Sequence, residues 1–163
     1  MPVRWTGMRC MSGERFTLDT NILVYSVDGR SGSKQQVALR IIELAVLADC
    51  WLTLQSLSEF YSAVTRKALM PPERAAETAR IWLDLFPVAT ASEASVRTAL
   101  TAASAGRASY WDALLVATAA EAGCTAVLTE DMADGSTLNG VAVLNPFGDG
   151  DLAPAALSLL TGE

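Results

Sequence analysis

Short apolar segments alternate with longer amphipathic segments along most of this chain, and this alternation limits the possible fold more than any other feature. The short segments are apolar at consecutive positions, which is typical of strands buried on both faces of a parallel sheet. Successive parallel strands need crossover helices, and the longer segments have the required helical spacing. The sequence therefore predicts an α/β domain whose parallel sheet is covered on both faces. Strands are expected at residues 15–18, 50–54, 87–88, 125–128 and 141–144.

The longer segments carry recognisable helix boundaries. Pro72 suits a first helical turn, Ser92 suits an N-cap, and Gly106 suits a helix end. The domain is expected to span residues 15–147, with a weakly ordered N-terminal extension at 1–14 and a tail at 148–163 that holds a candidate short helix. Helices are predicted at residues 36–48, 56–69, 72–86, 92–105, 109–122 and, in the tail, 153–160, with an apolar turn at 22–25 and loops at 28–33 and 129–140.

The chain has no histidine among its 163 residues. Imidazole is the usual proton shuttle near neutral pH and the commonest transition-metal ligand, so Ser-His-Asp triads, Cys-His dyads and histidine zinc sites are excluded. Cys10, Cys50 and Cys124 are far apart and odd in number, which predicts a reducing, cytoplasmic setting. We expect no membrane association, because no apolar run is long enough to span a bilayer and residues 1–15 lack the apolar stretch of a secretory signal.

The formal net charge of −6 argues at first against a nucleic-acid partner, because phosphate binders usually carry a surplus of Lys and Arg. The charge is unevenly distributed, however. Residues 1–107 contain all 12 basic residues and 10 acidic ones, whereas the last 56 residues contain 8 acidic residues and no basic one. The acidity of the chain therefore belongs to its last third.

Four acidic residues stand near the carboxyl ends of predicted strands or near the starts of predicted helices: Asp19, Glu59, Asp112 and Asp131. Taken alone, Asp19 fits an N-cap, and Asp112 with Ser109 fits a capping box. Glu59 fits a solvated helix face and Asp131 a solvated turn. The combination is explained better by a site, because the carboxyl ends of parallel strands share one edge of the sheet, where α/β folds bind their ligands.

Carboxylates gathered at one edge need a cation, because like charges within about 6 Å raise one another's pKa. The chain offers neither histidine nor a thiolate cluster, and oxygen ligands select a hard cation such as Mg²⁺ or Mn²⁺. Such an ion activates a water molecule and stabilises the leaving oxygen of a phosphodiester without help from histidine. The candidate acids therefore favour metal-dependent phosphodiester chemistry.

Four segments carry these acids: FTLDTNILVY at 16–25, LSEF at 57–60, YWDAL at 110–114 and LTEDM at 128–132, with the acids 40, 53 and 19 residues apart. In sequence and order they resemble the PIN-domain ribonucleases of the VapC toxin family, over most of residues 16–147. The resemblance implies a three-layer α/β/α PIN-like fold with a central parallel sheet, a Mg²⁺ or Mn²⁺ centre, and endonucleolytic cleavage of RNA. It also implies the toxin of a toxin-antitoxin pair, with a cognate antitoxin protein as partner and a homodimer for which the helices at 56–69 and 72–86 offer surface.

The resemblance assigns roles to the four acids. Asp19 and Asp112 match the acids that ligate the metal most directly. Glu59 and Asp131 match the acids that complete the cluster and orient the attacking water.

Asn21 and Thr129 match polar positions that flank the pocket. The fourth segment departs from the family pattern, because it lacks the usual Asp-Phe ending. Asp131 and Asp134 therefore compete for the role of the fourth acid. Asp131 is favoured because it lies nearer the end of the strand, and Asp134 is then expected to flank the pocket.

Contact with RNA requires positive charge near the acids, and Arg66, Lys67 and Arg107 are the candidates. The alternative for the first two is a favourable interaction with the dipole at the end of their helix. Trp111, beside Asp112, fits a base-stacking role or, as is more common for tryptophan, a place in the core.

Three other functions compete with a ribonuclease. A non-catalytic PIN-like module that binds RNA or protein is the main alternative. Aspartate-based phosphotransfer domains are disfavoured, because Asp19 is followed by Thr20-Asn21 where dehalogenase-type enzymes require Asp-x-Asp, and no lysine follows Lys67. A P-loop motif is absent, so a nucleoside triphosphatase has no support.

Overall fold

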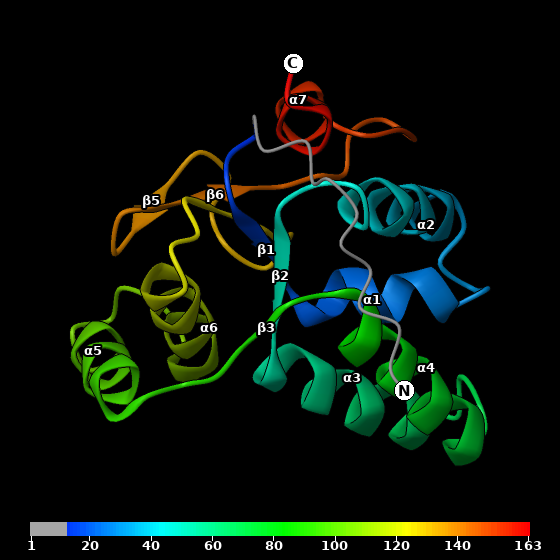
Figure 1. Cartoon of the computed structure of the whole chain (residues 1–163), viewed down its shortest axis with the longest axis horizontal. Helices are drawn as coiled ribbons and strands as arrows, with labels where there is room; N and C mark the ends of the chain where they lie inside the picture. Colours follow the sequence, from blue (N-terminus) through cyan, green and yellow to red (C-terminus); the bar gives the residue numbers. More distant parts are fainter. Residues whose placement is uncertain (1–12) are drawn as a thin grey trace, which may run out of the picture.

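The computed structural model describes residues 13–163, so most of the predicted N-terminal extension, with Cys10, lies outside the described residues. Within this part of the chain, a central sheet has the strand order β3-β2-β1-β4-β6-β5 (Figure 1). The strands are β1 (Phe16–Leu18), β2 (Cys50–Thr53), β3 (Val88–Ala89), β4 (Ala126–Leu128), β5 (Thr137–Leu138) and β6 (Val141–Leu144). The helices are α1 (Thr20–Val27), α2 (Ser33–Ala45), α3 (Leu54–Arg66), α4 (Pro72–Leu85), α5 (Glu93–Ser104), α6 (Tyr110–Glu121) and α7 (Pro154–Thr161).

The alternation of side chains along the strands builds one core on each face of the sheet. Phe16 and Leu18 of β1 point into a core shared with α1, α2, α3 and α4. Val127 of β4 and Val143 of β6 point the other way, into a core shared with α5 and α6. Figure 1 shows these two groups of helices on opposite sides of the sheet. The predicted three-layer α/β/α fold is therefore confirmed.

Two local predictions are wrong. The segment 129–140 was expected to be a loop, but it contains β5, which pairs antiparallel with β6, so the sheet is mostly rather than wholly parallel. The segment 22–25 was expected to be an apolar turn, but it lies inside the two-turn helix α1 because Asp19 caps that helix. The strands β1, β2, β3, β4 and β6 pair in parallel as predicted.

The predicted helix of the tail is present as α7. Ala156 and Leu160 are buried in the same core as β1 and α1, so the tail packs onto the domain. Among residues 13–163, no helix combines the length and the apolar character that crossing a bilayer requires.

The parallel strands end side by side, and this arrangement positions the candidate site. Asp19 follows β1, and Thr129 follows β4, the neighbouring strand. Helix α3 begins directly after β2, and α6 packs against the sheet near β2. Side chains from four separate stretches of the sequence therefore lie at one edge of the sheet.

Candidate active site

Asp19 is the most buried of the predicted acids, with 7% of its surface exposed. Its Oδ1 accepts a hydrogen bond from the Thr20 backbone N–H at 2.6 Å, which caps α1. Its Oδ2 accepts hydrogen bonds from the Thr129 hydroxyl at 2.7 Å and from the Asn21 side chain at 3.2 Å. Asp19 thus caps a helix and also lies within the predicted site.

Asn21 and Thr129 connect Asp19 to Asp131. The Asn21 amide donates to Asp131 Oδ2 at 3.0 Å in addition to its bond with Asp19. The fully buried Thr129 accepts a bond from the Asp131 backbone N–H at 3.1 Å while its hydroxyl donates to Asp19. Two of the predicted pocket-flanking residues, Asn21 and Thr129, therefore fix the position of Asp131 relative to Asp19.

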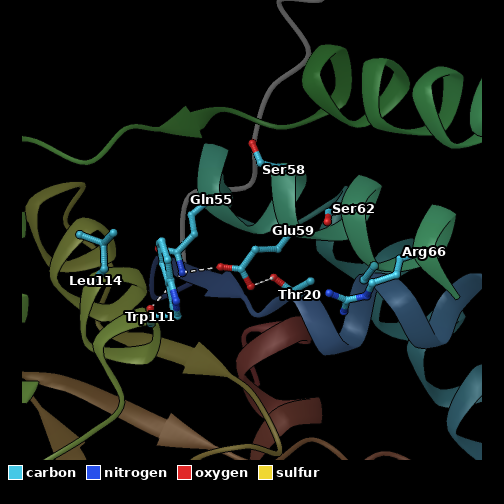
Figure 2. A pocket seen from close by; sticks show the side chains of 9 residues that line it. Thr20, Gln55, Ser58, Glu59, Ser62, Arg66, Trp111 and Leu114 are labelled. Carbon is cyan, nitrogen blue, oxygen red and sulfur yellow. Dashed lines mark hydrogen bonds between the residues drawn. The ribbon is translucent and has the colours of Figure 1, made fainter.

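Glu59 reaches the same region from the second turn of α3. Its Oε2 accepts a hydrogen bond from the Thr20 hydroxyl at 3.3 Å, and its Oε1 accepts one from Gln55 Nε2 at 2.8 Å (Figure 2). Glu59 is therefore half-buried and bonded on both oxygens, rather than pointing freely into solvent from a polar helix face.

Asp112 lies in the first turn of α6. Ser109 caps this helix by accepting a bond from the Asp112 backbone N–H at 3.1 Å, and the Ser109 hydroxyl donates to Asp112 Oδ2 at 2.7 Å. The capping explanation is thus correct for Ser109. It does not account for the position of the Asp112 side chain, which lines two cavities.

One cavity of about 420 Å³ brings the four favoured acids together. Its wall also contains the predicted residue Asn21 and two of the predicted RNA-contact residues, Arg66 and Lys67. Both bases are exposed, and neither has an ion-pair partner within the described part of the chain. We call this space the carboxylate cavity; the acids on its wall are Asp19, Glu59, Asp112, Glu130 and Asp131.

The remaining predicted residues lie elsewhere. Arg107 is exposed on a neighbouring cavity of about 490 Å³, whose wall it shares with Asp112 and Asp131. Asp134, predicted to flank the pocket, is on the wall of neither cavity, because its Oδ1 instead accepts a bond from the Asn145 backbone N–H at 2.8 Å. Of the two competing acids, the structure brings only Asp131 to the other three.

Sequence reasoning missed Glu130 and the two side chains that hold it. Lys34 Nζ forms an ion pair with Glu130 Oε2 at 2.6 Å, and the Tyr25 hydroxyl donates to Glu130 Oε1. Lys34 also lies 5.0 Å from the centre of the Tyr25 ring, within the range of a cation–π contact. Nothing in the local sequence signals a contact between residues 96 positions apart, although the proximity of Glu130 to Asp131 was a usable hint.

The surroundings of Asp19 in the carboxylate cavity disfavour its charged form. Burial raises the pKa of Asp19 from its ordinary value of 3.8 to about 6. Hydrogen bonds from Thr129 and Thr20 lower this pKa, whereas the negative charges of Asp112 and Asp131 raise it further. A cation placed among these carboxylates would relieve this repulsion.

The donor set fits a hydrated hard cation. All the side chains on the acidic wall offer oxygen, and Asn21 Oδ1 is a further buried oxygen with no hydrogen-bond partner. Within residues 13–163, no three acidic, cysteine or histidine side chains already surround one point closely enough to hold an ion. Mg²⁺ commonly keeps several water ligands and takes one or two carboxylates, so this spacing is compatible with it.

Trp111 corrects one expectation. Of its two predicted placements, base stacking and the more common place in the core, the second is wrong, because 60% of its surface is exposed at the start of α6. The reason is its position on the helix: the next residue, Asp112, faces the carboxylate cavity, and the buried face of α6 begins at Ala113.

Comparison with protein-family models matches residues 16–133 to the PIN domain. This match covers well over half of the chain, and the chain therefore belongs to the PIN-domain family.

Solved structures with the same fold include several toxin proteins. A toxin-antitoxin complex from Klebsiella pneumoniae matches at 20% identity and a TM-score of 0.60, over 80% of this chain and 97% of that chain. VapC20 from Mycobacterium tuberculosis, described as a sarcin-ricin loop cleaving toxin, matches at 20% identity and a TM-score of 0.52, over 69% and 86%. DNA-bound VapBC from Salmonella typhimurium matches at 16% identity and a TM-score of 0.57, over 80% and 96%. Comparison with curated protein sequences gives no match.

Proposed function

We propose that this protein is a metal-dependent endoribonuclease and the toxin of a toxin-antitoxin pair. The observation that carries the proposal is the meeting of Asp19, Glu59, Asp112 and Asp131 in one cavity, although they come from four separate stretches of the chain. Membership of the PIN-domain family supports a nuclease. The similar structures, a toxin-antitoxin complex and a sarcin-ricin loop cleaving toxin, support an antitoxin as the partner and RNA as the substrate class.

Asp19 and Asp112 would hold the metal, with Glu59 and Asp131 completing the cluster. A bound Mg²⁺ or Mn²⁺ would supply an activated water and would offset the negative charge that develops on the phosphate. Thr129 and Asn21 keep the carboxylates of Asp19 and Asp131 oriented, because both donate hydrogen bonds into this pair.

Arg66 and Lys67 supply the positive charge that RNA needs beside so many carboxylates. They lie at the end of α3 on the wall of the carboxylate cavity, where no acid neutralises them among the described residues. A phosphate that contacts them is held over the acids. Arg107, beyond Asp112 and Asp131, would contact a phosphate on the far side of the cluster.

The test is cleavage of RNA by the purified full chain with Mg²⁺ or Mn²⁺, compared with the variants Asp19→Asn and Asp112→Asn. We expect the wild type to cut RNA and each variant to lose at least about 100-fold in rate, because the electrostatic stabilisation by each carboxylate–metal contact is lost. Asp134→Asn is the matched control and should keep wild-type activity, since Asp134 lies outside the cavity. A wild type that cuts no RNA, or variants that cut as fast, would contradict the proposal.

The proposed antitoxin would inhibit by placing an arginine among the carboxylates, where a charge-assisted pair takes the place of the metal's charge. The same cleavage assay tests this: adding the co-expressed partner should suppress cleavage, and unchanged cleavage would contradict it.

We also propose a homodimer, because Leu54 and Tyr61 of α3 and Ile81 and Leu85 of α4 are each more than 40% exposed. Light scattering of the purified protein tests this, because a dimer has twice the mass of a single chain.

A further inference from the structure

A second cavity adjoins the carboxylate cavity, between α3 and α6 (Figure 2). Its volume is about 560 Å³, and Thr20, Glu59 and Arg66 line both spaces. Because these side chains line both spaces, the two cavities lie next to each other. We call the second space the α3–α6 pocket.

Trp111 lies at one end of this pocket, and Gln55 connects its backbone to Glu59 by hydrogen bonds. Gln55 Nε2 donates to the Trp111 carbonyl oxygen at 3.0 Å and to Glu59 Oε1 at 2.8 Å. The Tyr110 ring packs edge-on against the indole, with 5.2 Å between ring centres. These contacts keep a large, 60% exposed aromatic ring beside Asp112.

The chemical character of the α3–α6 pocket changes along its length. Trp111 and Leu114 form an apolar end, and Arg66 places a cation at the opposite end (Figure 2). The middle is polar, with the hydroxyl groups of Ser58 and Ser62 and the hydrogen-bonded Gln55–Glu59 pair, whose carboxylate can accept bonds from sugar hydroxyls. A nucleotide presents the same order of groups: a flat aromatic base, a polar sugar and a phosphate.

We propose that the α3–α6 pocket binds one unpaired base of the RNA substrate, stacked on Trp111, beside the phosphodiester that lies over the carboxylates. This inference rests on the proposed function. Stacking on an aromatic ring accepts every base, because every base has a π-face, but it requires a base that has left the helical stack. The pocket therefore selects for an unpaired nucleotide at this position and not for a particular base.

The experiment combines a change in the protein with a change in the RNA. An unstructured 12-nucleotide RNA that the wild type cuts is taken from a mixed pool, and single abasic nucleotides are placed in turn around the mapped cut. Loss of one stacked base should lower kcat/KM of the wild type by roughly 5- to 150-fold at one position next to the cut. Trp111→Ala should show the same loss on the intact RNA and no further loss with the abasic nucleotide at that position.

Two matched variants separate stacking from structure. Trp111→Phe keeps a ring and should retain most of the activity and the sensitivity to the abasic position. Leu100→Ala removes a comparably exposed apolar side chain from α5, 54% exposed, and should behave as the wild type.

Three results would overturn the inference while the proposed function stands. In the first, the wild type cuts RNA and no abasic position near the cut matters. In the second, Trp111→Ala remains as sensitive to the abasic position as the wild type. In the third, Trp111→Ala changes the mass of the protein but not its cleavage, which would assign this face to a second copy of the chain. A wild type that cuts no RNA would instead overturn the proposed function and this inference with it.

Discussion

Asp19 determines much of the electrostatic behaviour of the site, because its carboxylate is buried and faces other carboxylates. Its pKa of about 6 means that the folded protein binds a proton at Asp19 more tightly than the unfolded chain does, whose value is close to 3.8. Asp19 therefore contributes stability at low pH, and this contribution is lost as the pH rises through about 6. Above that pH the charged Asp19 destabilises the metal-free fold by about 3 kcal/mol.

This leads to a pH-dependent comparison with Asp19→Asn in EDTA. Between about pH 4.5 and pH 7.5, the wild type should lose roughly 2 kcal/mol of its free energy of unfolding relative to the variant, which has no carboxylate at this position. Urea unfolding at the two pH values measures the difference. Adding Mg²⁺ at the higher pH should stabilise the wild type more than the variant. Equal pH dependence of the two proteins would contradict the shifted pKa.

The sequence identified the acids better than the residues that hold them. The positions of Asp19, Glu59, Asp112 and Asp131 relative to predicted strands and helices were enough to predict that the four acids meet, and they do line one cavity. It did not reveal the Lys34–Glu130 ion pair, because that contact depends on how α2 packs against the segment after β4. The sequence favoured a buried Trp111 for a related reason. Tryptophan side chains are usually buried, and the exposure of Trp111 depends on how α6 is rotated about its axis against the sheet.

At the level of elements, helix caps place two of the acids: Asp19 is itself the cap of α1, and Asp112 is held by the cap of α6. Ser109 caps α6 and holds Asp112, and Ser92 caps α5 by accepting a bond from the Ser95 backbone N–H at 3.1 Å. The two caps are similar in kind, but only Ser109 contacts a residue of the carboxylate cavity.

The pair Ser109→Ala and Ser92→Ala therefore separates helix stability from site geometry. Each variant should lose about 1 kcal/mol of stability, or roughly 2 to 4 °C in Tm, because each loses an N-cap. Ser109→Ala should in addition lose about 10-fold in RNA cleavage, since the Asp112 carboxylate loses the hydroxyl that orients it. Thermal unfolding and cleavage rates measure the two effects. Equal activity in the two variants would show that the Ser109 hydroxyl does not position Asp112.

The elements were predictable where periodicity was clear, and less so in short segments. The parallel strands and the longer helices were found because each is apolar in the expected pattern. The strand β5 was missed because two residues are too few to show alternation. The sequence does carry a signal there, because an Asn-Gly pair between two strands is typical of a tight hairpin. In the structure Asn139 and Gly140 have the positive φ values, 51° and 77°, that such a turn requires.

At the level of the whole molecule, the uneven charge distribution both repels and attracts RNA. The chain has a net charge of −6, and five carboxylates line the carboxylate cavity. Lys34 is paired with Glu130, so within the described residues the positive charge left for RNA near these carboxylates comes from Arg66 and Lys67 on one side and Arg107 on the other. RNA should therefore be held by few phosphate contacts, with the metal offsetting the acids between them.

This arrangement predicts a shallow dependence of RNA affinity on salt. Three phosphate contacts to a single strand give a slope of about −2 in a plot of log K against log[salt], or roughly 20-fold weaker binding when KCl rises from about 50 to 200 mM. Fluorescence anisotropy of a labelled 12-nucleotide RNA, with the Asp112→Asn variant at constant Mg²⁺, measures this slope without cleavage. Arg66→Ala on this background should reduce its magnitude by about 0.7, because one phosphate contact is lost.

Arg74→Ala is the matched control, because Arg74 is an exposed base of α4 that lines neither the carboxylate cavity nor the cavity of Arg107. It should leave the slope unchanged. A slope that Arg66→Ala does not alter would place the phosphates away from α3, and the RNA would then reach the carboxylates from the side of Arg107 alone. A slope much steeper than −2 would require basic residues outside the two cavities to contact RNA, and the effect of Arg74→Ala would then show whether α4 is among them.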